Sequence, residues 1–186
     1  MNTYEARKEP HFLEAYKKEI DIPVNRLLEI GVQYGGSLRI WHDMFPEAEI
    51  VGVDIDPGCK RHARPQDNIS IQIGDQMDLK FLDSLGEFDV ILDDGGHTMD
   101  QQQTSFRVLF PKMPKGSIYI IEDTHTSYWS KFWDAPDKTI DVLKGFVDDI
   151  HSYSMGDRSG AGVDLKNPFS IDSIHFYPGT CIIKKK

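Results

Sequence analysis

The sequence of 186 residues predicts a single-domain α/β protein with a doubly wound, mostly parallel sheet. Short apolar runs typical of buried strands alternate with segments of helical periodicity, the order expected for parallel strands joined by crossover helices. Two further runs flank Pro178-Gly179, which predicts an antiparallel hairpin that closes the sheet. The expected strands cover residues 27–30, 49–54, 69–73, 88–92 and 117–121, and the hairpin strands cover 173–177 and 180–183.

Helices are expected between these strands and before the first one. Apolar residues recur at helical spacing from Phe12 to Ile20, so residues 1–24 should include a lead-in helix beside the first strand. A second helix should begin after Ser37, whose hydroxyl can cap the first turn. The remaining expected elements are helices over 100–109 and 140–153 and a surface loop over 156–162.

Composition limits the classes of partner. The net charge of −9 repels a polyphosphate backbone, so we expect no nucleic acid partner. The sequence has no apolar run near the ~20 residues of a membrane span and no apolar signal region at its start, so we expect no membrane partner. Cys59 and Cys181 are too few for a disulfide framework or a zinc site, which fits a cytoplasmic protein.

Residues 27–37, with the sequence LLEIGVQYGGS, predict the ligand-holding corner of the sheet. A strand, a glycine turn and a helix N-terminus together hold ligands at the edge of open α/β sheets. Asp54 ends the next strand at about the 20-residue offset from Gly31 expected of a carboxylate that holds a ribose. Gln33 replaces the second glycine of a dinucleotide fingerprint, which disfavours a diphosphate and a nicotinamide-dependent dehydrogenase. We therefore expect a nucleoside-like ligand, and a purely structural turn is the alternative.

Polar residues follow all five parallel strands, at the edge where ligands of such sheets bind. These groups are Gly31–Ser37, Asp54, Asp75-Gln76, Asp93–His97 and Glu122–His125.

Three of these residues, Asp94, Glu122 and Asp123, predict a divalent metal site. The fourth and fifth strands should be neighbours, so their ends would converge. Carboxylate oxygens without thiolates suit Mg²⁺, Mn²⁺ or Ca²⁺. The alternative is that these acids cap helices or lie solvated in loops.

His97 is the candidate general base, since imidazole can accept a proton near neutral pH. A cation-bound hydroxyl has a lowered pKa, so a metal and His97 together would make an alcohol nucleophilic. His125 competes for the role of base or of an extra ligand. The alternative for His97 is a histidine hydrogen-bonded in a turn.

Anchored by Glu29 and Asp54, the glycine segment resembles the first motif of class I S-adenosylmethionine-dependent methyltransferases, whose cofactor has a ribose but no phosphate. The segment Asp93-Asp94-Gly95-Gly96-His97, followed by residues 121–129 with the sequence IEDTHTSYW, resembles a narrower group. This group comprises the metal-dependent macrolide sugar O-methyltransferases of mycinamicin and macrocin type and the related cephalosporin-biosynthesis methyltransferases. The resemblance covers roughly residues 26–133.

The resemblance implies transfer of a methyl group from S-adenosylmethionine to a sugar or glycoside hydroxyl, with Mg²⁺ or Mn²⁺. It implies catalysis by His97 and Asp94, and a metal held by Asp94, Glu122 and Asp123. The implied cofactor residues are Glu29, Gly31, Tyr34, Gly35, Ser37, Asp54, Ile55, Asp75, Gln76 and Asp93.

Two departures from these relatives leave the acceptor and any homo-oligomeric assembly open. Gly96 replaces the usual serine, and the chain has no long amino-terminal extension before its motifs. The same carboxylates would also suit a catechol-type O-methyltransferase, and a non-catalytic nucleoside-binding module would keep the fold without the reaction.

Residues 124–138 contain aromatic side chains but little periodicity. Aromatic faces pack well against sugars and aglycones, which predicts an acceptor platform or lid. The alternative is ordinary core beneath an irregular loop. The expected acceptor residues are His125, Tyr128, Trp129 and Trp133.

Overall fold

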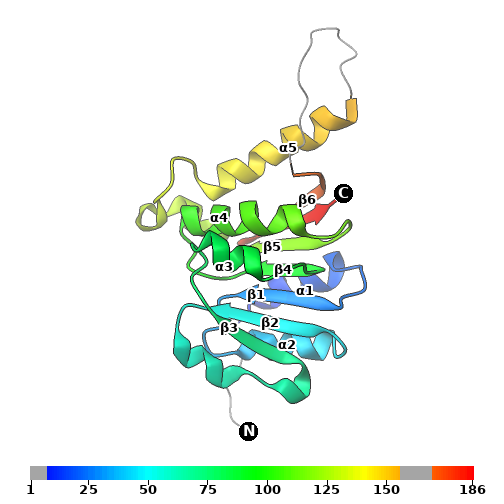
Figure 1. The fold of residues 1–186 in the computed structure, drawn as a ribbon. Coiled ribbons are helices and arrows are strands. Elements are labelled where there is room, and N and C mark those ends of the chain that lie inside the picture. The colour runs from blue at the N-terminus through cyan, green and yellow to red at the C-terminus, as the bar shows by residue number, and fades with distance from the viewer. Residues whose placement is uncertain (1–7, 156–168) are drawn as a thin grey trace.

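The structure, a computed structural model, describes residues 8–155 and 169–186. Within these residues seven strands form one sheet in the order β3-β2-β1-β4-β5-β7-β6 (Figure 1). The first five strands are parallel, and β7 pairs antiparallel with both β5 and β6. The predicted fold class is therefore confirmed. The strands are β1 (Arg26–Ile30), β2 (Glu49–Asp54), β3 (Ile69–Ile73), β4 (Val90–Asp93), β5 (Ile118–Glu122), β6 (Ile171–Tyr177) and β7 (Thr180–Lys185).

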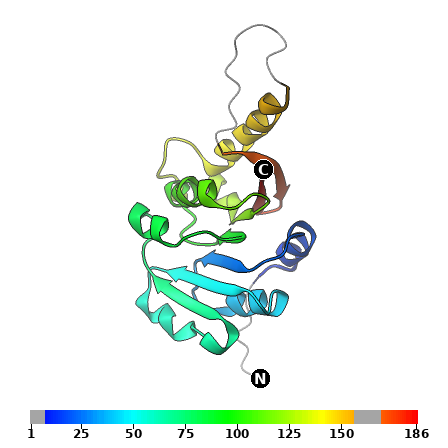
Figure 2. The same cartoon turned by 45° about the vertical axis from the view of Figure 1, so that its right-hand side comes forward.

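Helices cover both faces of this sheet (Figure 2). Tyr16 of α1 and Trp41 of α2 are buried against one face, and Phe106 of α4 and Phe146 of α5 pack against the other. Burying a large side chain of this kind contributes about 1.5–3 kcal/mol, so these contacts fix the helices on the sheet. The helices are α1 (Pro10–Glu19), α2 (Gly36–Met44), α3 (Leu79–Ser84), α4 (Met99–Leu109) and α5 (Thr139–Met155).

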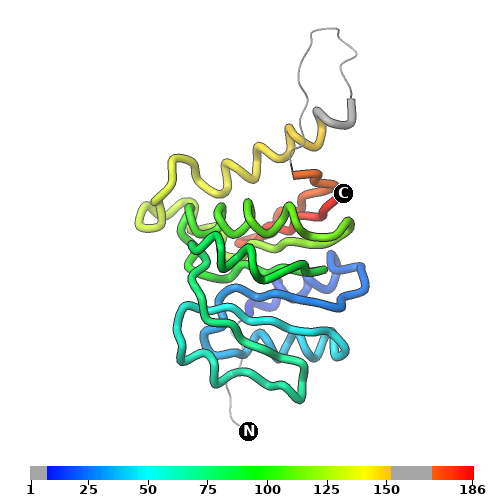
Figure 3. The backbone as a smooth tube through the Cα atoms, viewed as in Figure 1, coloured from blue at the N-terminus to red at the C-terminus, as the bar shows by residue number. Residues whose placement is uncertain are grey.

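The chain reverses its winding direction between β1 and β4. It proceeds outward from β1 to β2 and β3, and then returns to place β4 on the other side of β1 (Figure 3). In the register, Ile30 pairs with both Val53 and Asp93, and Asp93 pairs with Ile121. The ends of β1, β2, β4 and β5 therefore lie at one edge, around the point where open α/β sheets bind ligands.

Several predicted boundaries need correction. Ser37 is not the cap of α2, because the helix begins at Gly36 and Gly35 precedes it in a left-handed conformation with φ of 67°. Strand β4 begins at Val90, where pairing with β1 starts at Leu27, and not at residue 88. The predicted loop over 156–162 lies outside the described residues.

Helix α3 was absent from the sequence prediction. It has only six residues and buries only Leu82, so it carries too little periodicity to detect. Asp78 marks its start, because this side chain accepts hydrogen bonds from the backbone N–H groups of Lys80 and Phe81. Across the part of the chain that the structure describes, none of the helices combines the length and apolarity needed to cross a membrane.

Candidate cofactor and metal site

A cavity of about 1120 Å³ opens where the winding direction reverses. It is at least as large as usual small-molecule sites of roughly 300–1,000 Å³, so it has room for a nucleoside and a second molecule. Predicted cofactor residues that line it are Gly31, Tyr34, Ser37, Asp54, Ile55, Asp75 and Gln76. Glu29, Gly35 and Asp93, also predicted, are outside its lining.

Gly31 brings the end of β1 against the loop that follows β4. Its φ of 95° is a conformation that side chains disfavour, and a Cβ there would lie 2.7 Å from the carbonyl carbon of Asp94. The glycine is therefore required for the close approach of these two chain segments. This approach brings the cofactor corner and the candidate metal site together.

Asp54 holds the glycine turn. Its Oδ2 accepts hydrogen bonds from the backbone N–H groups of Val32 and Gln33 at 2.9 and 3.0 Å, and its Oδ1 accepts one from Asp56 at 2.9 Å. Partial burial alone would raise the pKa of Asp54, but these backbone donors outweigh it and lower the pKa. An ionised carboxylate therefore lies at the cavity wall, with lone pairs left for a ligand hydroxyl.

Gln76 and Asp93 form a buried polar network beneath the loop of residues 94–97. Gln76 donates to Ser105 at 3.1 Å, and its Oε1 accepts from the backbone N–H of Gly96 at 2.8 Å. Complete burial raises the pKa of Asp93 to about 7. In this structure the Gln76 amide therefore supports the loop that carries His97.

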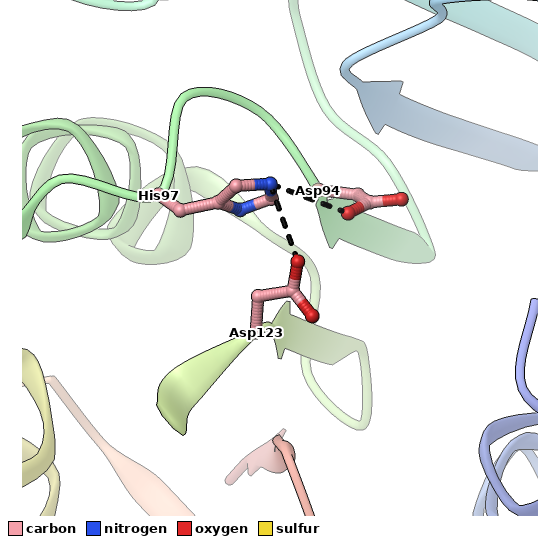
Figure 4. Close-up of side chains that lie close together, drawn as sticks. All are labelled: Asp94, His97 and Asp123. Atoms are coloured by element: carbon pink, nitrogen blue, oxygen red, sulfur yellow. Dashed lines mark ion pairs between the residues drawn. The ribbon is translucent and has the colours of Figure 1, made fainter. Parts of the chain in front are cut away.

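Asp94, His97 and Asp123 converge at the cavity edge (Figure 4). The Nε2 of His97 lies 3.3 Å from Asp123 Oδ2 and 4.0 Å from Asp94 Oδ1. One donor atom from each residue lies within 4.8 Å of the others, and this mixed oxygen and nitrogen set fits a divalent cation. His97 and Asp123 have φ values of 59° and 53°, an uncommon conformation for residues other than glycine that is enriched at functional sites.

Glu122 and Asp123 are neighbours in the sequence but have different partners. The buried carboxylate of Glu122 accepts a short hydrogen bond from Tyr16 and another from Lys8 at 2.6 Å. Burial raises the pKa of Glu122. Glu122 is therefore near the candidate metal site, but in this structure it is paired with protein donors.

Lys8 was absent from the predicted site. Its ammonium also lies 2.7 Å from Asp94 Oδ2 and 3.7 Å from Glu29. Burial alone would lower the pKa of Lys8, but the carboxylates of Glu29, Glu122 and Asp94 outweigh it and raise the pKa. No local motif marks this lysine, because its partners are distant in the sequence.

The aromatic segment is exposed and not core. Tyr128, Trp129 and Trp133 have exposed fractions of 63%, 48% and 47%, which rules out the alternative that they are core. Trp133 Nε1 donates to the carbonyl of Ser127 at 2.9 Å. His125 contacts the Trp129 ring edge-on, and its Nδ1 lies 3.8 Å from Asp123 Oδ1. His125 therefore lies beside the metal candidate with Trp129 against it, and all four predicted acceptor residues are outside the cavity lining.

The sheet order, the closing hairpin and the site at the winding reversal define a class I methyltransferase fold. Residues 28–124 match the sequence model of a family described as a methyltransferase domain, and the chain belongs to this family. The predicted family is thereby confirmed.

Curated relatives refine this comparison. The chain is 31% identical to 8-demethyl-8-alpha-L-rhamnosyl tetracenomycin-C 2'-O-methyltransferase of Streptomyces olivaceus, with 100% of the chain and 51% of the relative covered. It is 36% identical to mycinamicin VI 2''-O-methyltransferase of Micromonospora griseorubida, with 86% of the chain and 43% of the relative covered. The chain thus spans about half the length of these relatives.

Solved structures agree. The mycinamycin-pathway methyltransferase MycE, in complex with Mg, SAH and mycinamycin VI, matches with a TM-score of 0.80 and 31% identity, covering 94% of this chain and 48% of that one. A caffeoyl-CoA O-methyltransferase described as putative, from Staphylococcus aureus, has a TM-score of 0.61 at 12% identity, and the match covers 98% of this chain and 86% of that one. The latter likeness concerns the fold alone.

Proposed function

We propose that the chain catalyses methyl transfer from S-adenosylmethionine to a hydroxyl of a sugar or glycosylated small molecule, assisted by Mg²⁺ or Mn²⁺. The observation that carries this proposal is the convergence of Asp94, His97 and Asp123 on a cavity that also contains Asp54 and the glycine turn. Relatives named as sugar O-methyltransferases, and the MycE complex with Mg and SAH, support the same assignment.

The cofactor would occupy the cavity that the glycine turn and Asp54 both line. Asp54 would accept hydrogen bonds from the ribose hydroxyls, and Gly31 would leave room for the methionine part. Tyr34, Ser37, Ile55, Asp75 and Gln76 line the remaining wall. Glu29, Gly35 and Asp93 would act from outside the lining by supporting this wall.

Asp94 and Asp123 would hold the divalent cation, and His97 would not be a ligand in this proposal, because its Nε2 lone pair is needed to accept a proton. Glu122 would join them as a third carboxylate if it exchanged Lys8 for the ion. A bound divalent cation would supply orientation and a lowered pKa for the acceptor hydroxyl.

His97 would take the proton from the acceptor hydroxyl at Nε2. Asp123, 3.3 Å away, would stabilise the imidazolium that forms. The acceptor oxygen would then be aligned for in-line attack on the sulfonium methyl group. His125, Tyr128, Trp129 and Trp133 would contact the acceptor from outside the cavity.

We place this reaction in the cytoplasm, with a small glycoside and not a nucleic acid or membrane as partner. Both cysteines are free and buried, which fits a reducing compartment.

The test is methyl transfer from S-adenosylmethionine labelled in its methyl group, with a rhamnosyl or other deoxysugar glycoside and, separately, a catechol as acceptor. We expect a labelled glycoside that disappears with chelator and returns with Mg²⁺ or Mn²⁺. Full transfer after exhaustive chelation would show that the acids have another role. Cofactor binding without transfer to any acceptor would favour a nucleoside-binding module.

A further inference from the structure

We propose that Lys8 is a displaceable counter-cation of the metal site, which a divalent ion must expel before it can use Asp94 together with Glu122. This inference rests on the proposed function in one respect, namely that the acids bind a divalent ion. Lys8 would then set the affinity of the site for that ion.

The contacts of Lys8 show a specific position within the acid cluster. Its ammonium lies 2.6 Å from Glu122 Oε1 and 2.7 Å from Asp94 Oδ2, with Glu29 at 3.7 Å. Only 6% of the Lys8 side chain is exposed. The nitrogen thus lies among three carboxylates, of which Glu122 and Asp94 are at hydrogen-bond distance and Glu29 and Glu122 are buried, whereas an ordinary surface lysine pairs with a single exposed acid.

Asp94 links this lysine to the candidate ion site. Asp94 Oδ2 accepts the hydrogen bond from Lys8. The other carboxylate oxygen of Asp94, Oδ1, lies 4.0 Å from His97 Nε2 (Figure 4). A cation held by both Asp94 and Glu122 would need the space and the lone pairs that the ammonium occupies. A divalent ion on Asp94 and the ammonium of Lys8 would also repel each other, because both would contact the same carboxylate. Binding of the ion therefore opposes retention of Lys8.

The backbone around Lys8 would permit this exchange. Lys8 lies before the first residue of α1 and belongs to no helix or strand. Helix α1 is anchored independently by buried Phe12, Ala15 and Tyr16. Tyr16 would keep its hydrogen bond to Glu122 after Lys8 has moved. The side chain of Lys8 can therefore leave without removal of the helix.

The first experiment measures the reactivity of the Lys8 amine in the unmodified protein. Lysines are acetylated with acetic anhydride, without cofactor or acceptor, and the rate at each is read by peptide mass spectrometry. Exposed Lys115 serves as internal control. We expect saturating Mg²⁺ to raise the rate at Lys8 at least about fivefold and to leave Lys115 unchanged, because the ion shifts the population with a free amine. An unchanged or lower rate at Lys8 would overturn the proposal.

The second experiment measures Mn²⁺ affinity by electron paramagnetic resonance in Lys8→Met and Lys8→Arg. We expect Lys8→Met to bind Mn²⁺ at least about tenfold more tightly than the parent protein, because no internal cation competes. Lys8→Arg keeps the charge and should not gain affinity. Equal or weaker binding by a folded Lys8→Met would count against the proposal, and if this variant does not fold, acetylation of the parent protein decides.

Neither experiment measures methyl transfer. A failure of the proposed function would therefore show as missing transfer with Lys8 displacement intact. A failure of this inference would show as metal-dependent transfer with no ion effect on Lys8.

Discussion

His97 is held in a left-handed conformation, with φ of 59°, and its Nε2 faces Asp94 and Asp123. A non-glycine residue in this conformation costs free energy that the surrounding structure must offset. The loop is fixed from below by the hydrogen bond between Gly96 and Gln76. The structure therefore determines the direction of this imidazole, as a general base requires.

His97→Ala should lower turnover by about 10²- to 10⁴-fold, the usual contribution of a general base, and leave cofactor affinity nearly unchanged. The measurement is single-turnover methyl transfer together with calorimetric titration of S-adenosylhomocysteine. His125→Ala is the matched control, because His125 is more exposed, at 44% of its side chain against 23% for His97. Because His125 is also a proposed acceptor contact, turnover is compared at saturating acceptor. Loss of turnover there in His125→Ala alone would move the base to His125.

Asp54 should make stability depend on pH through its lowered pKa. A carboxyl whose pKa is lower in the folded state stabilises the fold above its unfolded pKa, near 3.8, and loses this contribution as pH falls through the folded value. Asp54→Asn should therefore reduce the free energy of unfolding by about 1–2 kcal/mol at pH 7.

This difference between the parent protein and Asp54→Asn should shrink as pH falls below about 4. Urea unfolding at pH 7, 4 and 3 measures the change. Exposed Asp43 gives the control variant, Asp43→Asn, which is measured at the same three pH values. A difference that stays constant across this range would show that the hydrogen bonds to Asp54 do not depend on its charge.

The sequence alone predicted that Asp54, Asp94, His97 and Asp123 lie at one edge of the sheet, and all four line one cavity. Asp54 ends β2, and the other three lie in the loops that follow β4 and β5, strands whose apolar runs are clear. The sequence could not predict the partners of these residues. Lys8 contacts Glu122 across 114 sequence positions, and Gln76 contacts Gly96 across 20. Such pairs depend on the three-dimensional fold and leave no local pattern. Their roles in the reaction stay predictions.

At the scale of elements, Gly31 determines how closely β1 approaches the loop after β4. Gly31→Ala should reduce the free energy of unfolding by more than about 2 kcal/mol and weaken Mn²⁺ binding, because the new Cβ would displace the backbone of Asp94. Urea unfolding and Mn²⁺ titration measure these effects.

Gly116→Ala is the matched control for this prediction. Gly116 also has a positive φ, of 82°, but a Cβ there would meet nothing within 4 Å. The free energy of unfolding of Gly116→Ala should fall only by the cost of placing a residue with a side chain in the left-handed conformation, about 1–2 kcal/mol. Equal effects of the two substitutions would show that close approach at Gly31 contributes nothing.

Strands were more predictable than helix ends. Buried parallel strands such as β1 and β2 are mostly apolar runs, with Glu29 as the charged exception inside β1, so their position was evident. The start of α2 was not, because a serine after two glycines suggested a cap, whereas the left-handed conformation of Gly35 turns the chain directly into the helix. A short helix with one buried residue, such as α3, falls below what periodicity can detect.

At the scale of the whole molecule, the reversal of winding direction between β1 and β4 brings the candidate site residues together. It gathers the ends of strands far apart in the sequence into one cavity, and α1 closes the adjacent edge with Tyr16 and the neighbouring Lys8. The alternation of strands and helices predicted this architecture. The acceptor could not be predicted in the same way, because the exposed aromatic segment has little periodicity and its sequence specifies no ligand.

The most direct test of the account is anomalous diffraction from a crystal of the protein grown with S-adenosylhomocysteine and Mn²⁺. The account predicts an anomalous peak within about 2.2 Å of carboxylate oxygens of Asp94 and Asp123, and the cofactor ribose against Asp54. A peak away from these two residues, or a cofactor outside the cavity at the reversal between β1 and β4, would contradict it.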